Sequence, residues 1–182
     1  MTAAIEVRNL VKRFGGLVAT NNLSFDLDEG ESLGLIGPNG AGKTTVFAQI
    51  MGELAQTSGT IRFKGQEISG LSTSERISRG ISRTYQVPRP FTELTVRENI
   101  RVGLMPNNIR QLVFGATDRA QEERFAESVG FNLRHLEDLS RAFHGRSGKL
   151  EFARTLATGA KTLLLDEIFA GLTTGEIAMI QT

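Results

Sequence analysis

The feature that most constrains the fold of this chain is a glycine-rich segment, Gly37-Pro38-Asn39-Gly40-Ala41-Gly42-Lys43-Thr44-Thr45. It has the phosphate-binding (P-loop) pattern, in which a glycine and four further residues precede Gly-Lys-Thr. Glycines let the backbone curl so that several N–H groups aim at one anion, and a helix that begins at the lysine adds the positive end of its dipole. We therefore expect a polyphosphate here, with Lys43 on its β- and γ-phosphates and the Thr44 hydroxyl on Mg²⁺.

The residues on either side of this loop favour the strand, loop and helix order that the motif requires. Leu33-Gly34-Leu35-Ile36 is an unbroken apolar run, which predicts a buried strand leading into the loop. Thr45 to Met51 predicts a helix that leaves it. The alternative, a chance match in an ordinary turn, has a probability of roughly 1% or less in a chain of this length.

Composition is that of one ordinary globular domain. The chain has 182 residues, of which 40% are hydrophobic and 23% charged, a net charge of +1 and no cysteine. The small net charge gives no reason to expect nucleic acid as a partner. Without cysteine there are no disulfides or thiolate metal sites, which is typical of the cytosol. No apolar run is long enough to cross a bilayer, so we expect any membrane role to act through a partner.

Two half-buried strands are predicted before the loop, because apolar residues alternate with polar ones around Ile5 and again from Leu23 to Leu27. Phe14 lies between them, and its spacing alone leaves open core packing or an aromatic platform for adenine. Residues 60–63 and 81–86 predict further strands. Capping-box patterns, Ser72 with Glu75 and Thr95 with Glu98, predict helices that end near residues 80 and 104. Residues 118–129, with one charged and solvated side, and 147–157 predict two more helices.

Two carboxylates follow an apolar strand predicted at residues 162–165. Ligands of α/β sheets bind beyond the carboxyl ends of parallel strands, so Asp166 is a candidate for Mg²⁺ and Glu167 for polarising a water that attacks the γ-phosphate. Gln86 ends the strand at 81–86 and enters a loop bounded by prolines. It is either an amide near the nucleotide or a solvated loop residue.

In order and spacing these motifs resemble the ATP-binding subunit of ABC transporters, in particular the branched-chain amino acid uptake type. The similar segments are the adenine-stacking loop (14–17), Walker A (37–44) and the Q-loop (83–86) with the residues after it (91–99). Walker B (163–167) and the D-loop (170–173) follow in the same order. The resemblance covers essentially the whole chain. It implies an α/β P-loop NTPase with a RecA-like core and an N-terminal antiparallel β part (1–87 and 146–182), and an inserted helical subdomain (88–145).

The resemblance also implies roles for individual residues. Phe14 would stack on adenine, and Gln86 would bind Mg²⁺ and position the attacking water. Lys43 would stabilise the transferred charge, Asp166 would serve Mg²⁺, and Glu167 would be the base.

Three departures from the family pattern stand out. The family's signature segment falls on Ala142 to Arg146, where only Gly145 is retained and Phe143 replaces a serine that would bond the nucleotide of the opposite subunit. Thr173 replaces the D-loop aspartate, and Ile168 the proline after the catalytic glutamate. We expect the chain to be truncated before the switch histidine, because neither of its two histidines, His135 and His144, lies in that place.

The function implied by the resemblance is ATP hydrolysis, with Mg²⁺, that powers import of a branched-chain or related amino acid. The implied partners are membrane permease subunits, a second ATPase subunit that is identical or different, and indirectly a periplasmic or extracellular solute-binding protein. The chain would then lie peripherally on the cytoplasmic face of the cell membrane. Two alternatives are a nucleotide-binding remnant without turnover and, ranked last, an ABC-type ATPase outside transport.

Overall fold

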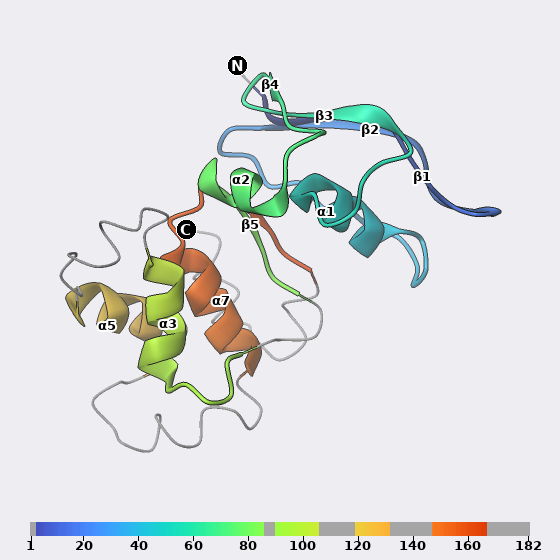
Figure 1. Ribbon diagram of the computed structural model, residues 1–182. Helices are drawn as coiled ribbons and strands as arrows, with labels where there is room; N and C mark the ends of the chain where they lie inside the picture. The colour runs from blue at the N-terminus through green and yellow to red at the C-terminus, as the bar shows by residue number, and fades with distance from the viewer. Residues whose placement is uncertain (1–2, 86–89, 106–118, 132–146, 167–182) are drawn as a thin grey trace. The chain divides into compact units, whose positions relative to one another are not determined.

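The structure is a computed structural model that describes residues 3–85, 90–105, 119–131 and 147–166. The chain divides into two compact units, residues 1–81 and residues 82–182, which we call the N-terminal unit and the C-terminal unit. Figure 1 shows the elements of both.

A four-stranded antiparallel sheet forms most of the N-terminal unit. Its strands are β1 (Ala3–Phe14), β2 (Leu17–Asp28), β3 (Ser58–Phe63) and β4 (Gln66–Glu67), in the order β2-β1-β3-β4. The alternation predicted for the first strand is confirmed, because Ile5 and Val7 are buried while Arg8 is exposed.

Two helices complete the N-terminal unit and lie on one side of its sheet (Figure 1). They are α1 (Lys43–Met51) and α2 (Thr73–Ser78). The capping box predicted for the second helix is confirmed: the Ser72 hydroxyl accepts from the Glu75 amide, and the Glu75 carboxylate accepts from the Ser72 amide at 2.8 Å. The Ser72 hydroxyl, which donates to the Glu75 carboxylate at 2.7 Å, and then the Ser72 amide lower the pKa of the Glu75 carboxyl.

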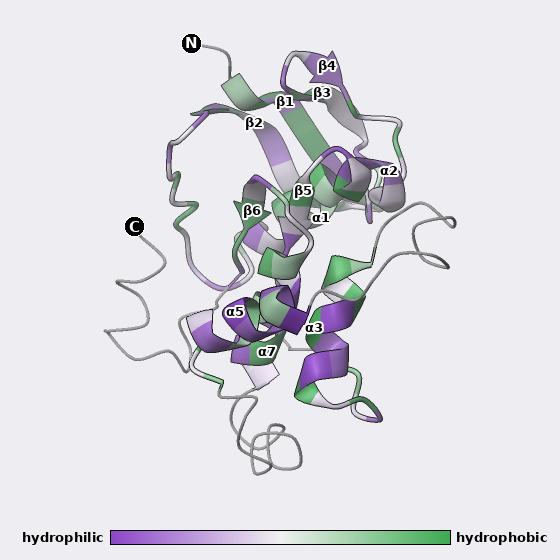
Figure 2. Cartoon of the chain, turned by 90° about the vertical axis from the view of Figure 1, so that its left-hand side faces the viewer, coloured by the Kyte–Doolittle hydropathy of each residue, from purple (hydrophilic) through white to green (hydrophobic). Residues whose placement is uncertain are grey.

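Three helices pack around one apolar core in the C-terminal unit. They are α3 (Val96–Leu104), α5 (Arg119–Ser128) and α7 (Ser147–Ala157), close to the ranges predicted for them. Figure 2 shows both apolar and polar residues along α3. Its apolar residues Val96 and Ile100 are fully buried in the core shared by the three helices. Strands β5 (Ile81–Arg83), which begins at the last residue of the N-terminal unit, and β6 (Thr162–Leu164) form a two-stranded sheet.

The strand predicted at residues 33–36 is wrong. Residues 31–38 belong to no strand or helix, and Leu33 and Ile36 are 48% and 95% exposed. An apolar run becomes a strand only where a neighbouring strand accepts and donates its main-chain hydrogen bonds. In the part of the chain that the structure describes, no strand pairs with these residues.

Two other predictions from the sequence need correction. The strand predicted at 81–86 ends at Arg83, and the Tyr85 amide donates instead to the Glu151 carboxylate at 2.6 Å. The charged side of 118–129 is not wholly solvated, because Glu122 is fully buried between two arginines. Along the described ranges, no helix has the length and apolar character needed to cross a bilayer.

Candidate nucleotide-binding site

The loop at residues 37–42 has a backbone that depends on glycine. Gly40 and Gly42 have φ angles of 82° and 90°, which side-chain-bearing residues rarely adopt. A Cβ on Gly42 would lie 2.2 Å from the main-chain oxygen of Ala19, so this position also has no room for a side chain. The turn is closed by the Ala41 amide, which donates to the Pro38 carbonyl at 3.1 Å. The glycines of the motif therefore serve both curvature and close approach, as the sequence predicts.

Lys43 begins helix α1 and reaches back over the loop. Its ammonium donates to the Gly37 carbonyl at 2.6 Å and to the Pro38 carbonyl at 2.9 Å. The Val46 amide makes the first bond of the helix, to the Gly42 carbonyl at 2.9 Å, so the amides before it have no partner within the helix. A loop that brings an ammonium and helix-terminal amides together has the features of an anion-binding site. Thr44 is exposed in this first turn.

The far end of α1 is held by Arg76, a residue that sequence reasoning missed. Its side chain is 1% exposed, and its guanidinium donates to the carbonyls of Gln49 and Ile50, both at 2.8 Å. It also donates to Leu71 and Ser69 carbonyls at 3.0 Å and 2.9 Å. The positive charge thus lies at the negative end of the helix dipole. Burial lowers the pKa of this guanidinium.

Helix α1 is also tied to the sheet by a buried amide. Gln49 is fully buried, accepts a 3.0 Å hydrogen bond from the Thr20 hydroxyl of β2 and donates to the Val11 carbonyl of β1. The helix that carries the loop is therefore fixed at both its side and its end.

Phe14 lies at the tip of the β1–β2 hairpin. It is 47% exposed, and the Lys12 ammonium lies 5.0 Å from the centre of its ring. Core packing, one of the two possibilities left open by its spacing, is therefore wrong. An exposed ring at a hairpin tip is available for stacking.

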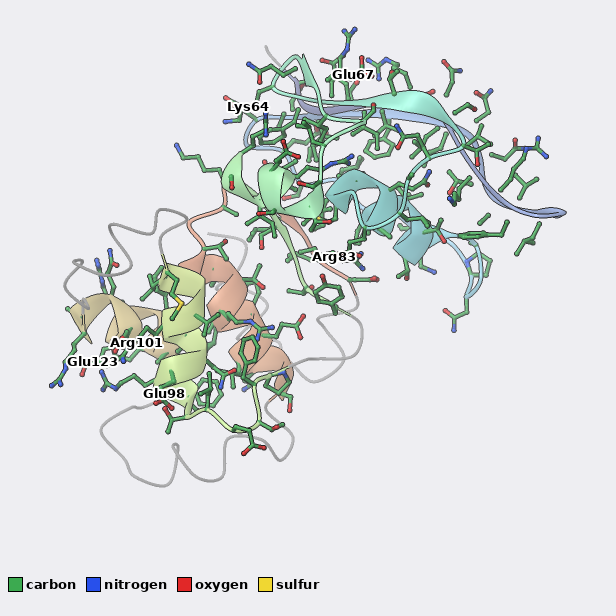
Figure 3. All side chains as sticks on the ribbon, viewed as in Figure 1. Lys64, Glu67, Arg83, Glu98, Arg101 and Glu123 are labelled. Carbon is green, nitrogen blue, oxygen red and sulfur yellow. The ribbon has the colours of Figure 1, made fainter. Side chains whose placement is uncertain are left out.

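Asp166 follows β6 in the C-terminal unit and is held by the residues after β5. Its amide donates to the Thr84 hydroxyl at 3.1 Å, and the Thr84 amide donates to the Leu164 carbonyl at 3.0 Å. Its carboxylate forms an ion pair with the Arg83 guanidinium at 3.2 Å, with both side chains less than one tenth exposed. Arg83, labelled in Figure 3, also lies over the Tyr85 ring, 4.8 Å from its centre. The pairing of Arg83 with Asp166 is the second contact that sequence reasoning missed.

The remaining predicted site residues, Gln86, Glu167 and Gly145, lie outside the described residues, as do His135, His144 and the predicted D-loop. Their roles stay predictions.

Each unit, taken by itself, has an oxygen group of the kind that Mg²⁺ takes as a ligand. Within the described ranges, no three His, Cys, Asp or Glu side chains gather as a metal cluster. Mg²⁺ does not need one, because it is commonly held by one or two protein oxygens, waters and substrate phosphates. The Thr44 hydroxyl and the Asp166 carboxylate are groups of that kind.

Comparison with known proteins places these features in a family. The family model described as ABC transporter matches residues 20–170. The high-affinity branched-chain amino acid transport ATP-binding protein LivG of Escherichia coli (strain K12) is 38% identical over 181 residues, which covers 92% of this chain and 70% of LivG. BraF of Pseudomonas aeruginosa, which has the same description, is 35% identical over 181 residues, with the same coverage.

A solved structure agrees with the sequence relatives. The crystal structure of the ADP conformation of an ATP-binding cassette from an ABC transporter superposes with a TM-score of 0.79 at 27% identity, covering 99% of this chain and 74% of that one. The resemblance drawn from the motifs is therefore confirmed: this chain belongs to the ABC transporter family, and its fold is that of the family's ATP-binding cassette.

Proposed function

We propose that this chain binds and hydrolyses ATP to power the import of a small solute, a branched-chain or related amino acid, through a membrane permease. The observation that carries the proposal is the glycine-dependent loop under the Lys43 ammonium at the start of α1. The solute class is supported by the similarity to LivG and BraF, which are branched-chain amino acid transport ATP-binding proteins.

The proposed nucleotide contacts follow from the geometry and the motifs. Residues 37–45 hold the phosphates through their amides. When nucleotide binds, the Lys43 ammonium leaves the loop carbonyls and contacts phosphate oxygens instead, as a point charge. Phe14 stacks on adenine from its exposed position. Gly145 faces the nucleotide held by a second ATPase subunit.

The proposed chemistry is attack of water on the γ-phosphate: a bond forms between the water oxygen and the γ-phosphorus, the bond from that phosphorus to the β–γ bridging oxygen breaks, and ADP leaves with the charge. Thr44, Asp166 and Gln86 would hold Mg²⁺, which would neutralise charge on the phosphates. Glu167 accepts a proton from the water that Gln86 orients, and Lys43 stabilises the charge on the transferred group.

The proposed partners are permease subunits, a second ATPase subunit and, indirectly, a periplasmic or extracellular solute-binding protein. The chain would lie peripherally on the cytoplasmic face of the membrane. In its proposed organisation the nucleotide-binding core is 1–87 with 146–182, and the helical subdomain is 88–145. None of the observations favours a remnant without turnover over this function.

The first experiment measures binding of a fluorescent ATP analogue and Mg²⁺-dependent phosphate release by the purified chain. We expect Lys43→Ala to abolish tight binding and Glu167→Gln to keep binding but lose phosphate release. The control is Lys161→Ala, which removes an exposed lysine outside the loop. Binding by the wild-type chain without phosphate release would favour the remnant instead.

A second experiment tests the transport assignment. Leucine uptake is measured in Escherichia coli cells that lack LivG and produce this chain, with the Lys43→Ala variant as the control. Uptake restored only by the wild-type chain supports the assignment. Phosphate release in the first experiment without restored uptake would contradict the solute and partner assignment while leaving the ATPase assignment intact.

A further inference from the structure

The carboxylate proposed to serve Mg²⁺ is already paired with a cation supplied by the chain. Arg83 at the end of β5 and Asp166 after β6 approach to 3.2 Å, with side-chain exposures of 3% and 7%. A carboxylate held this far from water needs a positive partner, because an isolated buried charge loses its hydration without compensation. In this structure Arg83 is such a partner.

Neighbouring groups hold the Arg83 guanidinium in position. Its Nε donates to the Thr84 carbonyl at 3.3 Å, and the guanidinium lies over the Tyr85 ring. Thr84 in turn holds the Asp166 amide through its hydroxyl. Residues 83–85 therefore orient both members of the ion pair, and Figure 3 shows Arg83 beside β5.

A guanidinium and Mg²⁺ cannot both bind the same carboxylate oxygen without repulsion. Each takes up carboxylate lone pairs, and two cations at one anion repel each other strongly where water is excluded. We propose that Arg83 is a positioning residue that neutralises Asp166 in the absence of metal and competes with Mg²⁺ for its carboxylate. This inference rests on the proposed function, because it assigns Asp166 to the Mg²⁺ of a bound nucleotide.

According to this proposal, Arg83 sets how strongly Mg²⁺ changes the affinity of the chain for nucleotide. Binding of Mg²⁺ and nucleotide must weaken the Arg83 to Asp166 pair before the carboxylate serves the metal. Removing the Arg83 charge therefore strengthens the effect of Mg²⁺ on nucleotide binding. A purely structural role of Arg83 would change nucleotide affinity by the same factor with and without Mg²⁺.

The test compares the Kd of a fluorescent ATP analogue in EDTA with its Kd in excess Mg²⁺, on the full 182-residue chain. The ratio of the two values is expected to rise about tenfold in Arg83→Gln, the size of effect expected from one nearby charge at modest effective dielectric. Gln keeps a donor for Asp166 but no charge. Arg83→Lys keeps a positive charge, so its ratio is expected to stay within about threefold of the wild-type value.

Two controls separate this effect from general damage. Arg79→Gln removes an exposed arginine whose guanidinium donates to the Glu75 carbonyl, and its ratio is expected to match the wild type. In an Asp166→Asn background, Arg83→Gln is expected to leave the ratio unchanged. An unchanged or lower ratio in Arg83→Gln, or an effect that persists in the Asp166→Asn background, overturns the proposal.

A measurement on the wild-type chain keeps the proposal testable if Arg83→Gln does not fold. Solvent exchange of the Arg83 guanidinium protons, followed by nitrogen-15 NMR, is expected to be faster with the analogue and Mg²⁺ than with the analogue in EDTA. Equal exchange in the two conditions overturns the proposal. A wild-type chain that binds no analogue in either condition overturns the proposed function and this inference together, whereas normal binding with equal exchange overturns the inference alone.

Discussion

The guanidinium of Arg76 donates a 2.8 Å hydrogen bond to the main-chain carbonyl of Gln49, so that a side chain from α2 caps the helix that carries the phosphate-binding loop. The same guanidinium reaches three further carbonyls. Helix carbonyls at a C-terminus have no partner within the helix, and here Arg76 supplies one. A Cβ on Gly52 would lie 2.8 Å from the Arg76 Nε, which shows how closely the backbone approaches this side chain.

Replacing Arg76 is expected to destabilise the fold strongly. Arg76→Met removes four hydrogen bonds from a buried guanidinium to carbonyls, although the Gln49 carbonyl keeps the Gly52 amide as a donor. We expect the free energy of unfolding to fall by about 3 kcal/mol or more, since several charged hydrogen bonds are lost. Urea unfolding followed by circular dichroism measures the change. The matched control, Arg79→Met, removes an exposed arginine of the same segment and should cost less than about 0.5 kcal/mol. Similar losses for the two variants would contradict the buried role of Arg76.

Glu122 and Glu123 are neighbours on α5 with very different surroundings. The Glu122 side chain is fully buried and bonded by Arg97 at 3.0 Å and Arg101 at 2.6 Å, whereas that of Glu123 is 37% exposed and reaches Arg97 at 3.5 Å. In Figure 3 the labelled Arg101 and Glu123 lie on adjacent helices. The hydrogen bond that the Arg101 guanidinium donates to the Glu122 carboxylate raises the pKa of Arg101.

We expect Glu122→Gln to lower the free energy of unfolding by about 3 kcal/mol, because it leaves two arginines beside a neutral buried group. Glu123→Gln should cost less than about 1 kcal/mol, as for other exposed ion pairs. Urea unfolding at neutral pH compares the two variants. Equal costs would mean that burial of Glu122 is not what gives this contact its strength.

The capping box of α3 is expected to weaken in acid. The Thr95 amide and then the Thr95 hydroxyl, each at 2.8 Å from the Glu98 carboxylate, lower the pKa of that carboxyl from its ordinary value. A carboxyl with a lowered folded-state pKa stabilises the fold fully above its unfolded pKa, and the contribution is lost as pH falls through the folded value.

Glu98→Gln is therefore expected to be less stable than the wild-type chain at pH 7, with a difference that shrinks as pH falls from about 5 to about 3. Urea midpoints of both chains across this range measure the difference. As a control for the loss of a carboxyl in general, Glu127→Gln removes an exposed carboxyl of α5 that belongs to no capping box. A Glu98→Gln difference that grows as pH falls would contradict the assigned direction of the shift.

Two glycines of the loop, Gly40 and Gly42, allow the cost of backbone strain to be measured apart from the cost of a steric clash. Both have positive φ, but a Cβ on Gly40 would meet no atom within 4 Å, whereas a Cβ on Gly42 would lie 2.2 Å from the Ala19 oxygen. We expect Gly42→Ala to lower affinity for a fluorescent ATP analogue by more than about tenfold, because the loop must leave the strand beside it. Gly40→Ala should cost roughly 1 kcal/mol of stability, the cost of strain alone, with a smaller loss of affinity. An analogue affinity reduced more by Gly40→Ala would refute this ordering.

Local patterns in the sequence predicted the features whose interactions are local. The loop at 37–45 and the two capping boxes each depend on residues a few positions apart, so their spacing is sufficient to identify them. The family also followed from the order of such motifs along the chain. The apolar run at 33–36 misled the same reasoning, since a strand requires hydrogen bonds to a neighbour that no local pattern describes.

By itself, the sequence determined that this chain contains a phosphate-binding loop, two capped helices and the motif order of an ABC cassette, because each depends on near neighbours in the chain. Only the tertiary structure decided which charged residues are buried and with whom. Arg76 meets Gln49 across 27 residues, Arg101 meets Glu122 across 21, and Arg83 meets Asp166 across 83. Such pairs form when packing excludes water from groups far apart in the chain, and their burial, not their spacing, is what makes them strong.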